Sequence, residues 1–379
     1  MITIHEVLKL KRFNTFRLIA GAGGLDKVVS KGGFIDHETA EEMRTLAFKN
    51  EMIFSNLPMI KDHPEKIVDF VGALIQAQTS CFALKTKIFN EIPEDAIILA
   101  NKHNYPLFLF DDTYIEELIL DIDGLVNTQK YLQKQVDILE IIMSNTLAPH
   151  NVRFEAYELN RSFKEHHIVC MIKPNTKSQP KLDIRSCQKL LDKEHSLFPY
   201  KDNYLLIMSK HTEEIKYESI LELLKLNENY TIGFSDIIND LTQLGTALNQ
   251  ALTSLKFACY KDKAKAHYRD IGIFQVIMPL LDQPVVSDYY RRMIQTLESY
   301  DDKYQSGLLD TAIAYIHGDG DIKKASDILY QHQNTIRYRV RKIKDLLNLE
   351  RLEGMQYESL AMAIHLHELN MNRDKFNLL

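Results

Sequence analysis

The most constraining feature of the sequence is a short segment near its C-terminal end, residues 331–347. Its apolar residues recur at steps of four, three and four: Ile336, Val340, Ile343 and Leu347. This spacing places them on one stripe of an α-helix. Residues 333–344 also contain five basic residues and no acidic one. The segment predicts a helix that is capped at Asn334, buries one side and presents a basic surface.

A second helix is expected directly before this segment. Residues 322–330 place Ala325, Ile328 and Leu329 on their predicted inner side, and a Gly-Asp-Gly breaker at 318–320 separates them from a further helix over 308–316. Two helices joined by a tight turn, the second with a basic outer face, are typical of a DNA-binding helix-turn-helix. A solvated basic helix is the plain alternative. The coincidence of scaffold helix, turn and capped basic helix favours DNA.

The predicted contacts with double-stranded DNA all come from the second helix. Arginine and lysine suit phosphates or guanine edges, the amides and Thr suit backbone or base edges, and Tyr adds a flat hydrogen-bonding ring. Five residues are expected directly opposite the apolar stripe: Asn334, Tyr338, Arg341, Lys342 and Asp345. The whole predicted set is Gln333, Asn334, Thr335, Arg337, Tyr338, Arg339, Arg341, Lys342 and Lys344.

The first 120 residues alternate short apolar runs with segments of helical length. The runs lie at 28–29, 52–54, 81–84 and 106–110, and the helical segments at 37–48, 64–76 and 93–103. Strands that alternate with helices indicate an α/β domain with a mainly parallel sheet.

Residues 121–150 are expected to form a connecting helix. Leu125, Leu132 and Leu139 recur every seven residues, and Val136 and Met143 form a second such row. Interleaved rows of this kind indicate a helix that packs against a partner helix. The partner is either a second subunit or the helix's own domain. The first alternative predicts a homodimer or higher oligomer to which Leu132, Val136 and Leu139 contribute.

The rest of the chain is expected to form an α+β domain over 151–300 and an all-α domain over 301–379. Predicted strands of the former lie at 167–172, 204–208 and 230–234, and its helices at 182–191, 215–226 and 236–257. A last helix is predicted over 355–369. The fold class is therefore multidomain α/β and α+β with a helical C-terminal domain.

Composition limits the class of protein. A net charge of −6 over 379 residues argues against general coating of nucleic acid, although it leaves room for a local basic patch. Four scattered cysteines without a CxxC pair indicate a reducing compartment rather than a zinc or redox site. No signal core and no run of 18 apolar residues occur. A cytoplasmic location without membrane contact is expected.

The helix-turn-helix segment resembles a known family. His332, Asn334-Thr335 and Arg337-Tyr338-Arg339 match the pattern of the C-terminal domain of PucR/CdaR-family bacterial transcriptional regulators. Residues 3–26 resemble the start of the purine-catabolism-regulator N-terminal domain, and residues 232–235 with the following helix resemble a degenerate GGDEF-like domain. Gln331 and Gln333 depart from the family pattern, which bears on base preference.

The resemblance implies an effector-responsive regulator with a sensor domain over 1–120, a connecting helix over 121–150, a degenerate GGDEF-like domain over 151–300 and a DNA-binding domain over 301–379. A small-molecule effector is an expected partner. The competing interpretation is a nucleotide-binding or cyclase-like signalling protein. No Gly-Gly-Asp/Glu-Glu-Phe sequence occurs in 160–300, so no catalytic residue, cofactor or enzymatic activity is predicted. A third interpretation is an interaction scaffold that binds no DNA.

Three other candidate sites are set aside. Gly21-Ala-Gly-Gly24 lacks the spacing and acidic residue of a dinucleotide site and predicts a plain turn. His365 and His367 lie two residues apart on a helix and so point to different faces. The adjacent pair His166-His167 enters a strand with its side chains on opposite faces. No metal site is predicted.

Overall fold

The computed structural model describes residues 2–111, 113–176, 182–349 and 354–376. The chain divides into two compact units, residues 1–135 and 136–379, and the division falls within the long helix α5 (Ile115–Met143). Across the described ranges, no helix is both long and apolar enough to cross a membrane.

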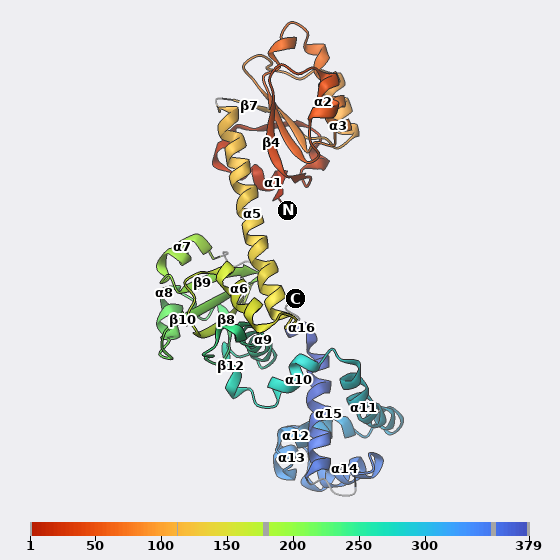
Figure 1. The fold of residues 1–379 in the computed structure, drawn as a ribbon. Helices are drawn as coiled ribbons and strands as arrows, with labels where there is room; N and C mark the ends of the chain where they lie inside the picture. Colours follow the sequence, from red (N-terminus) through yellow and green to blue (C-terminus); the bar gives the residue numbers. More distant parts are fainter. Residues whose placement is uncertain (1, 112, 177–181, 350–353, 377–379) are drawn as a thin grey trace. The chain divides into compact units, whose positions relative to one another are not determined.

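The first unit is built on a five-stranded sheet with the order β2-β7-β6-β5-β4 (Figure 1). Four strands run parallel: β4 (Lys31–Ile35), β5 (Glu51–Ser55), β6 (Cys81–Lys85) and β7 (Leu107–Phe110). An antiparallel strand, β2 (Arg17–Ala20), adds one edge. The prediction of a mainly parallel sheet is confirmed, although β2 and β4 were not predicted. The run at 28–29 is β3 and pairs with β1 (Ile2–Thr3) in a separate two-stranded sheet.

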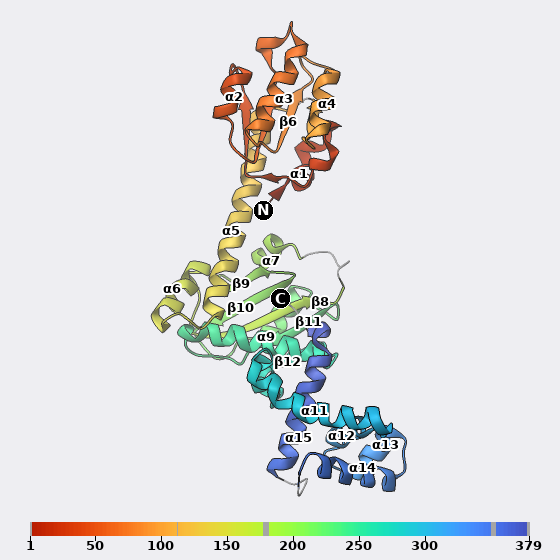
Figure 2. The same ribbon diagram turned by 90° about the vertical axis from the view of Figure 1, so that its right-hand side faces the viewer.

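Both faces of this sheet are covered, which explains why its central strands are continuous apolar runs. One face packs against α2 (Ala40–Leu46), α3 (Ile67–Gln76) and α4 (Glu94–Lys102). The other packs against α1 (Ile4–Val7), a 3₁₀ turn at Lys11–Thr15 and the start of α5. Figure 2 shows the three helices of the first face side by side.

The second unit contains a five-stranded sheet with the order β12-β11-β8-β10-β9. The strands are β8 (His166–Pro174), β9 (His195–Tyr200), β10 (Asn203–Lys210), β11 (Tyr230–Phe234) and β12 (Lys265–His267). All neighbours are antiparallel except β11 and β12. One face packs against α6 (Pro149–Leu159), α9 (Leu244–Tyr260) and the end of α5. The other packs against α7 (Ile184–Leu190) and α8 (Tyr217–Leu223).

The end of α5 shows where the seven-residue rows point. Leu139 is fully buried in the core beneath the second unit's sheet, and Val136 packs partly buried against the same core. Leu132 is half-buried. For this part of the helix the partner is its own domain, so Leu139 is not available to a second subunit. The helix also begins at Ile115, earlier than predicted, because Leu118 and Ile122 pack on the first unit's sheet.

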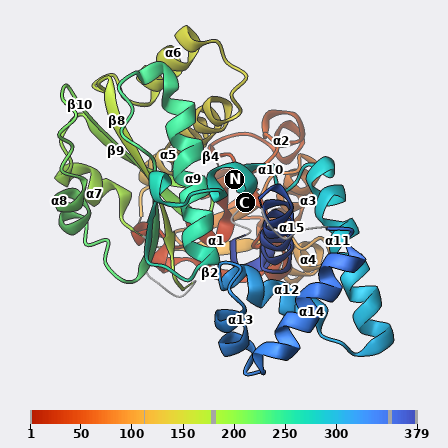
Figure 3. The same ribbon diagram turned by 90° about the horizontal axis from the view of Figure 1, so that it is seen from below.

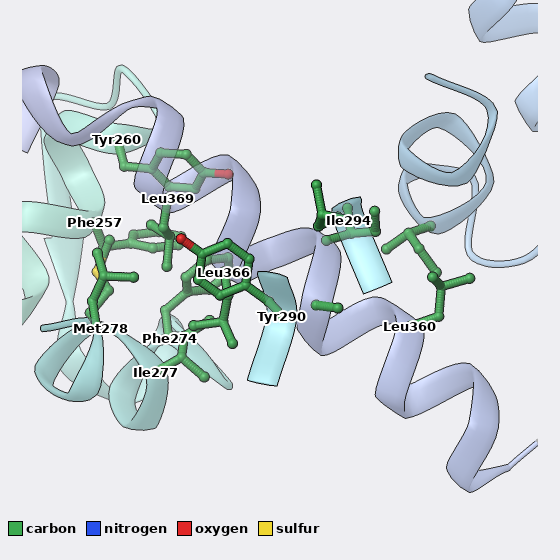
Figure 4. Packing of buried hydrophobic residues seen from close by; sticks show 14 of the residues in the cluster. Phe257, Tyr260, Phe274, Ile277, Met278, Tyr290, Ile294, Leu360, Leu366 and Leu369 are labelled. Atoms are coloured by element: carbon green, nitrogen blue, oxygen red, sulfur yellow. The ribbon is translucent and has the colours of Figure 1, made fainter. Parts of the chain in front are cut away.

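The C-terminal part of the second unit is entirely helical. It comprises α10 (Phe274–Leu280), α11 (Pro284–Tyr304), α12 (Leu308–His317), α13 (Ile322–Leu329), α14 (Gln333–Leu346), α15 (Met355–Met371) and α16 (Arg373–Phe376). Their main core also takes in Phe257 and Tyr260 from α9 (Figure 4). The boundary expected at residue 300 falls inside α11, which packs on α15.

Candidate nucleic-acid interface

The turn between α13 and α14 fixes the direction of the basic helix. Tyr330 ends α13 in the left-handed conformation, with φ 52°. The cap of α14 is His332, whose Nδ1 accepts the amide of Asn334 at 3.2 Å. The expected cap at Asn334 is therefore wrong, because the helix starts at Gln333, two residues earlier than predicted. Asn334 lies in the first turn, where its Oδ1 accepts a hydrogen bond from Arg337 Nη1 at 3.1 Å.

The buried stripe of α14 is confirmed. Ile336, Val340 and Ile343 are 0%, 8% and 1% exposed, and Leu347 is half-buried. Ile336 and Val340 share a small core with Ala314 of α12 and Ala325 of α13. This core holds the three helices together, and Figure 3 shows them gathered at one end of the second unit.

The inner side of α13 is only partly as predicted. Ala325 is fully buried and Leu329 packs partly buried against the small core. Ile328 is instead 46% exposed, and Ser326 is buried in its place. Ser326 tolerates burial because its hydroxyl donates a hydrogen bond to the carbonyl oxygen of Lys323 at 2.8 Å. The expectation for Ile328 is therefore wrong.

Six of the nine predicted contact residues lie exposed within the first nine residues of α14. They are Gln333, Asn334, Thr335, Arg337, Tyr338 and Arg341. Tyr338 is 69% exposed although it is aromatic. With the opposite side of α14 anchored in the core, these side chains form one polar and basic surface, called here the α14 surface. Guanidinium, amide and phenol groups on such a surface suit phosphate oxygens and base edges.

The other three predicted residues are half-buried: Arg339, Lys342 and Lys344. Arg339 Nη1 donates to Thr311 Oγ1 of α12 at 3.4 Å. The Nζ of Lys342 lies 5.2 Å from the ring centre of Tyr300 on α11. Lys342 therefore does not stand free on the outer side of α14, because α11 packs beside it.

Arg339 also belongs to the structure that starts α12. Asp301 accepts the amides of Leu308 and Leu309 at 2.8 and 2.9 Å. Burial acts to raise the pKa of Asp301, but the Leu309 amide, the Ser306 hydroxyl and the charge of Arg339 together lower that pKa below its ordinary value. Arg339 thus stabilises an ionised carboxylate at the helix start.

One residue of this region was missed by the sequence interpretation. Tyr330 is 95% exposed and stands in the turn beside the α14 surface. The residue that follows a helix at a tight turn commonly has a positive φ, and residues other than glycine or Asn are uncommon there. The need for one such residue between the two helices is the sequence signal by which Tyr330 could have been placed in the turn rather than in the preceding helix.

The candidate sites set aside from sequence are structural or lack converging ligands. Gly21 adopts φ 74° and begins a 3₁₀ turn, so the plain turn predicted at 21–24 is confirmed. All four cysteines are free thiols. His365 lies 3.8 Å from Glu368, which also pairs with His317 at 2.9 Å. Within the described ranges, no three His, Cys, Asp or Glu side chains gather as metal ligands would.

Two parts of the chain match family models. Residues 6–122 match the purine catabolism regulatory protein-like family, PucR, and residues 308–366 match the PucR C-terminal helix-turn-helix domain. The second match contains all of α12, α13 and α14. Two separate segments of the chain are thus similar to the N-terminal domain and to the C-terminal helix-turn-helix domain of the PucR family.

Three curated relatives come from Bacillus subtilis (strain 168). The DNA-binding transcriptional activator AdeR is 26% identical over 38% of this chain and 35% of its own length. The proline-responsive transcriptional activator PutR is 23% identical over 45% of each chain. The purine catabolism regulatory protein is 27% identical over 28% of this chain and 20% of its own. The matched part is less than half the length of each relative.

Among solved structures, the regulator of polyketide synthase expression from Bifidobacterium adolescentis matches with a TM-score of 0.32 and 13% identity. The match covers 63% of this chain and 98% of that one.

Proposed function

Because two segments of the chain are similar to the N-terminal and helix-turn-helix domains of the PucR family, we propose that it is a transcriptional regulator that binds operator DNA through α14. The observation that carries the proposal is the α14 surface. Its exposed groups are donors and acceptors, whereas the opposite side of the same helix is anchored by Ile336 and Val340. The residues at the start of a recognition helix are those that reach base edges in the major groove.

The α14 surface divides the proposed contacts by role. Gln333, Asn334 and Arg337 lie in the first turns and are assigned to base edges. Arg341 and the half-buried Lys344 lie further along, at positions suited to phosphates. Arg339 and Lys342 are assigned mainly to internal contacts with Thr311 and Tyr300. The proposed DNA set is therefore narrower than the nine residues predicted from the sequence.

Operator binding is expected to weaken steeply as salt concentration rises. Each phosphate contact contributes a slope of about −0.9 in log K against log salt. Two to three contacts per copy predict a slope of roughly −2 to −3 for one recognition helix, and twice that for a dimer. Gel shifts on the DNA upstream of the chain's own gene, at several salt concentrations, measure this slope. Scrambled DNA is the control, and equal affinity for both sequences with a flat salt response would contradict DNA recognition.

The N-terminal unit is proposed to bind a small-molecule effector. Its four parallel strands end at one edge of the sheet, where α/β domains commonly bind ligands. Asn56 directly follows β5, and its Oδ1 is buried with no hydrogen-bond partner among the described residues. An unpaired amide oxygen of this kind favours a ligand that donates a hydrogen bond. Metabolites of purine or nitrogen catabolism are the proposed class, by analogy with the family.

The effector is expected to raise the melting temperature of the full chain. A ligand at 100 times its Kd stabilises the folded state by about 2.7 kcal/mol. A thermal-shift screen of purines, ureides and amino acids measures this effect, and Asn56→Leu is expected to abolish it. Asp62→Asn, at an exposed position of the same unit, serves as the control. If no compound stabilises the chain, or if Asn56→Leu leaves the shift intact, the site at this sheet edge is excluded.

The domain over 151–300 is proposed to be a GGDEF-like scaffold without catalytic activity. Its antiparallel hairpin β9–β10 turns through Lys201 and Asp202, with φ 53° at Lys201. A cyclase would need a glycine-rich acidic sequence there, and this turn has none. The proposal therefore assigns the chain no enzymatic activity. A nucleotide-binding signalling protein is the alternative, and the helix-turn-helix match favours the regulator.

The regulator is proposed to act in the cytoplasm as a homodimer. One recognition helix reads only a few base pairs, and paired half-sites supply the specificity that an operator requires. The surface that joins the two copies is not the row through Leu139, because that residue is buried in its own domain.

A further inference from the structure

Helix α10 is apolar on nearly every side, since Gln275, whose amide donates a hydrogen bond to the carbonyl oxygen of Tyr268 at 2.6 Å, is its one polar residue. Residues 271–281 contain no charged residue, in a chain whose charged fraction is 26%. Phe274, Ile277 and Met278 point into the main helical core (Figure 4). A helix that is apolar all round is normally covered on all sides. The outer side of α10 is therefore the feature that needs an explanation.

That outer side is exposed. Ile273, Val276 and Leu280 follow one another at steps of three and four, and are 45%, 56% and 45% exposed. On α11, the next helix along the chain, Val285 is 73% and Tyr289 39% exposed, and the Tyr289 hydroxyl donates a hydrogen bond to the carbonyl oxygen of Ser359 on α15 at 3.3 Å. The five exposed apolar side chains are called the α10 face. They belong to the same core-sharing group of helices as α12 and α15.

The size of the α10 face suits the apolar centre of a dimer interface. Its four aliphatic side chains and one aromatic side chain are about half exposed, so they present on the order of 300 Å² of apolar surface. A stable interface buries about 800 Å² per partner, of which about 57% is apolar. The apolar part of one partner is then about 450 Å². The α10 face supplies roughly two thirds of this area.

The charges beside the α10 face favour a second copy of the chain as the occupant. Asp288, Arg291 and Arg292 are exposed on α11 next to Tyr289. Opposite charges lie one helical turn apart, so a two-fold axis would bring Asp288 of each copy opposite an arginine of the other. A partner surface with charges of only one sign would leave either Asp288 or the two arginines without an opposite charge.

We propose that the α10 face binds the same face of a second copy and forms a two-fold symmetric dimer. Figures 1 and 2 both show α14 at the end of the helical region away from α10, so the dimer leaves the α14 surface open. Because α10 shares one core with α12, the contact also fixes the relative position of the two recognition helices. The role of the dimer rests on the proposed DNA binding, but the dimer itself is measured without DNA.

The test is the mass of the full chain in sedimentation velocity at micromolar concentration, without DNA. Wild type is expected at twice the chain mass. The double variant Val276→Asp with Val285→Asp is expected at the single mass, with a dimer Kd raised at least about 30-fold, as loss of one 2 kcal/mol hot spot produces. Leu190→Asp with Leu223→Asp, at positions 54% and 48% exposed on α7 and α8, is the matched control and should remain dimeric.

Two results would overturn the proposal: a monomeric wild type at tens of micromolar, or a double variant that keeps the dimer mass. A monomer whose α10 amides resist hydrogen exchange would identify another part of the same chain as the occupant and would equally overturn it. The single variant Val285→Lys, at the most exposed position, covers the case in which the double variant does not fold. Failure of operator binding with the dimer mass intact would instead count against the proposed function.

Discussion

Replacing Arg337, Tyr338 and Arg341 together with alanine is expected to abolish binding to operator DNA. All three are exposed on the α14 surface and none contributes to the buried stripe. A base-edge contact provides about 1–3 kcal/mol of discrimination, so the triple change should raise the Kd for operator DNA at least about 100-fold. Fluorescence anisotropy with labelled operator DNA at fixed salt measures the change.

The matched control also replaces two arginines and one tyrosine with alanine, at exposed positions elsewhere: Arg44, Arg161 and Tyr114. This control should bind the operator as wild type does. Both triple variants should keep the wild-type circular dichroism and melting temperature. An unchanged operator Kd in the first variant would show that α14 is not the recognition helix. An operator Kd raised equally in the control would point to general charge rather than to the α14 surface.

Ile336→Asp is expected to unfold the helix-turn-helix. Ile336 is 0% exposed and lies in the small core formed with Ala314, Ala325 and Val340. A carboxylate placed there would be a buried charge without a partner, which costs about 3–5 kcal/mol. A loss of this size is a large part of the 5–15 kcal/mol that stabilises a whole domain. Limited proteolysis followed by mass spectrometry should find new cuts within residues 308–346.

Arg337→Asp is the control for this change, because it introduces the same side chain at the next residue on the exposed side. It should leave the proteolysis pattern and the melting temperature unchanged while it weakens operator binding. Equal resistance of the Ile336→Asp and wild-type chains would mean that the small core does not hold the three helices together.

Sequence periodicity predicted the buried stripe of α14 because a helix fixes its own geometry locally. It could not predict what lies beside the helix. Lys342 was placed on the open side, yet α11 covers it with Tyr300, and α11 itself was not predicted. The prediction for Ile328 was wrong for a related reason. A two-turn helix can rotate about its own axis so that Ser326 takes the inner position.

The first unit shows the same limit for strands. The buried runs that became β5, β6 and β7 were recognised because both sheet faces require apolar side chains. The edge strand β4 reads Lys-Gly-Gly-Phe-Ile and pairs with only one neighbour, so its sequence carries little of that signal. The seven-residue rows on α5 do contain buried residues, but a sequence repeat does not show which surface its residues pack against. Leu139 packs against the sheet of its own domain.

The placement of α15 makes the helical region sensitive to small rotations. Near one end of this helix, Leu366 and Leu369 lie beside Phe257 of α9, while Leu360 lies towards Ile294 of α11 (Figure 4). At 1.5 Å per residue, its 17 residues span about 25 Å. A tilt of about 10° at one end displaces the other by roughly 4 Å, and functional groups tolerate only about 0.5 Å of misplacement. Tilts of a few degrees are therefore large enough to move a recognition helix out of register with its bases.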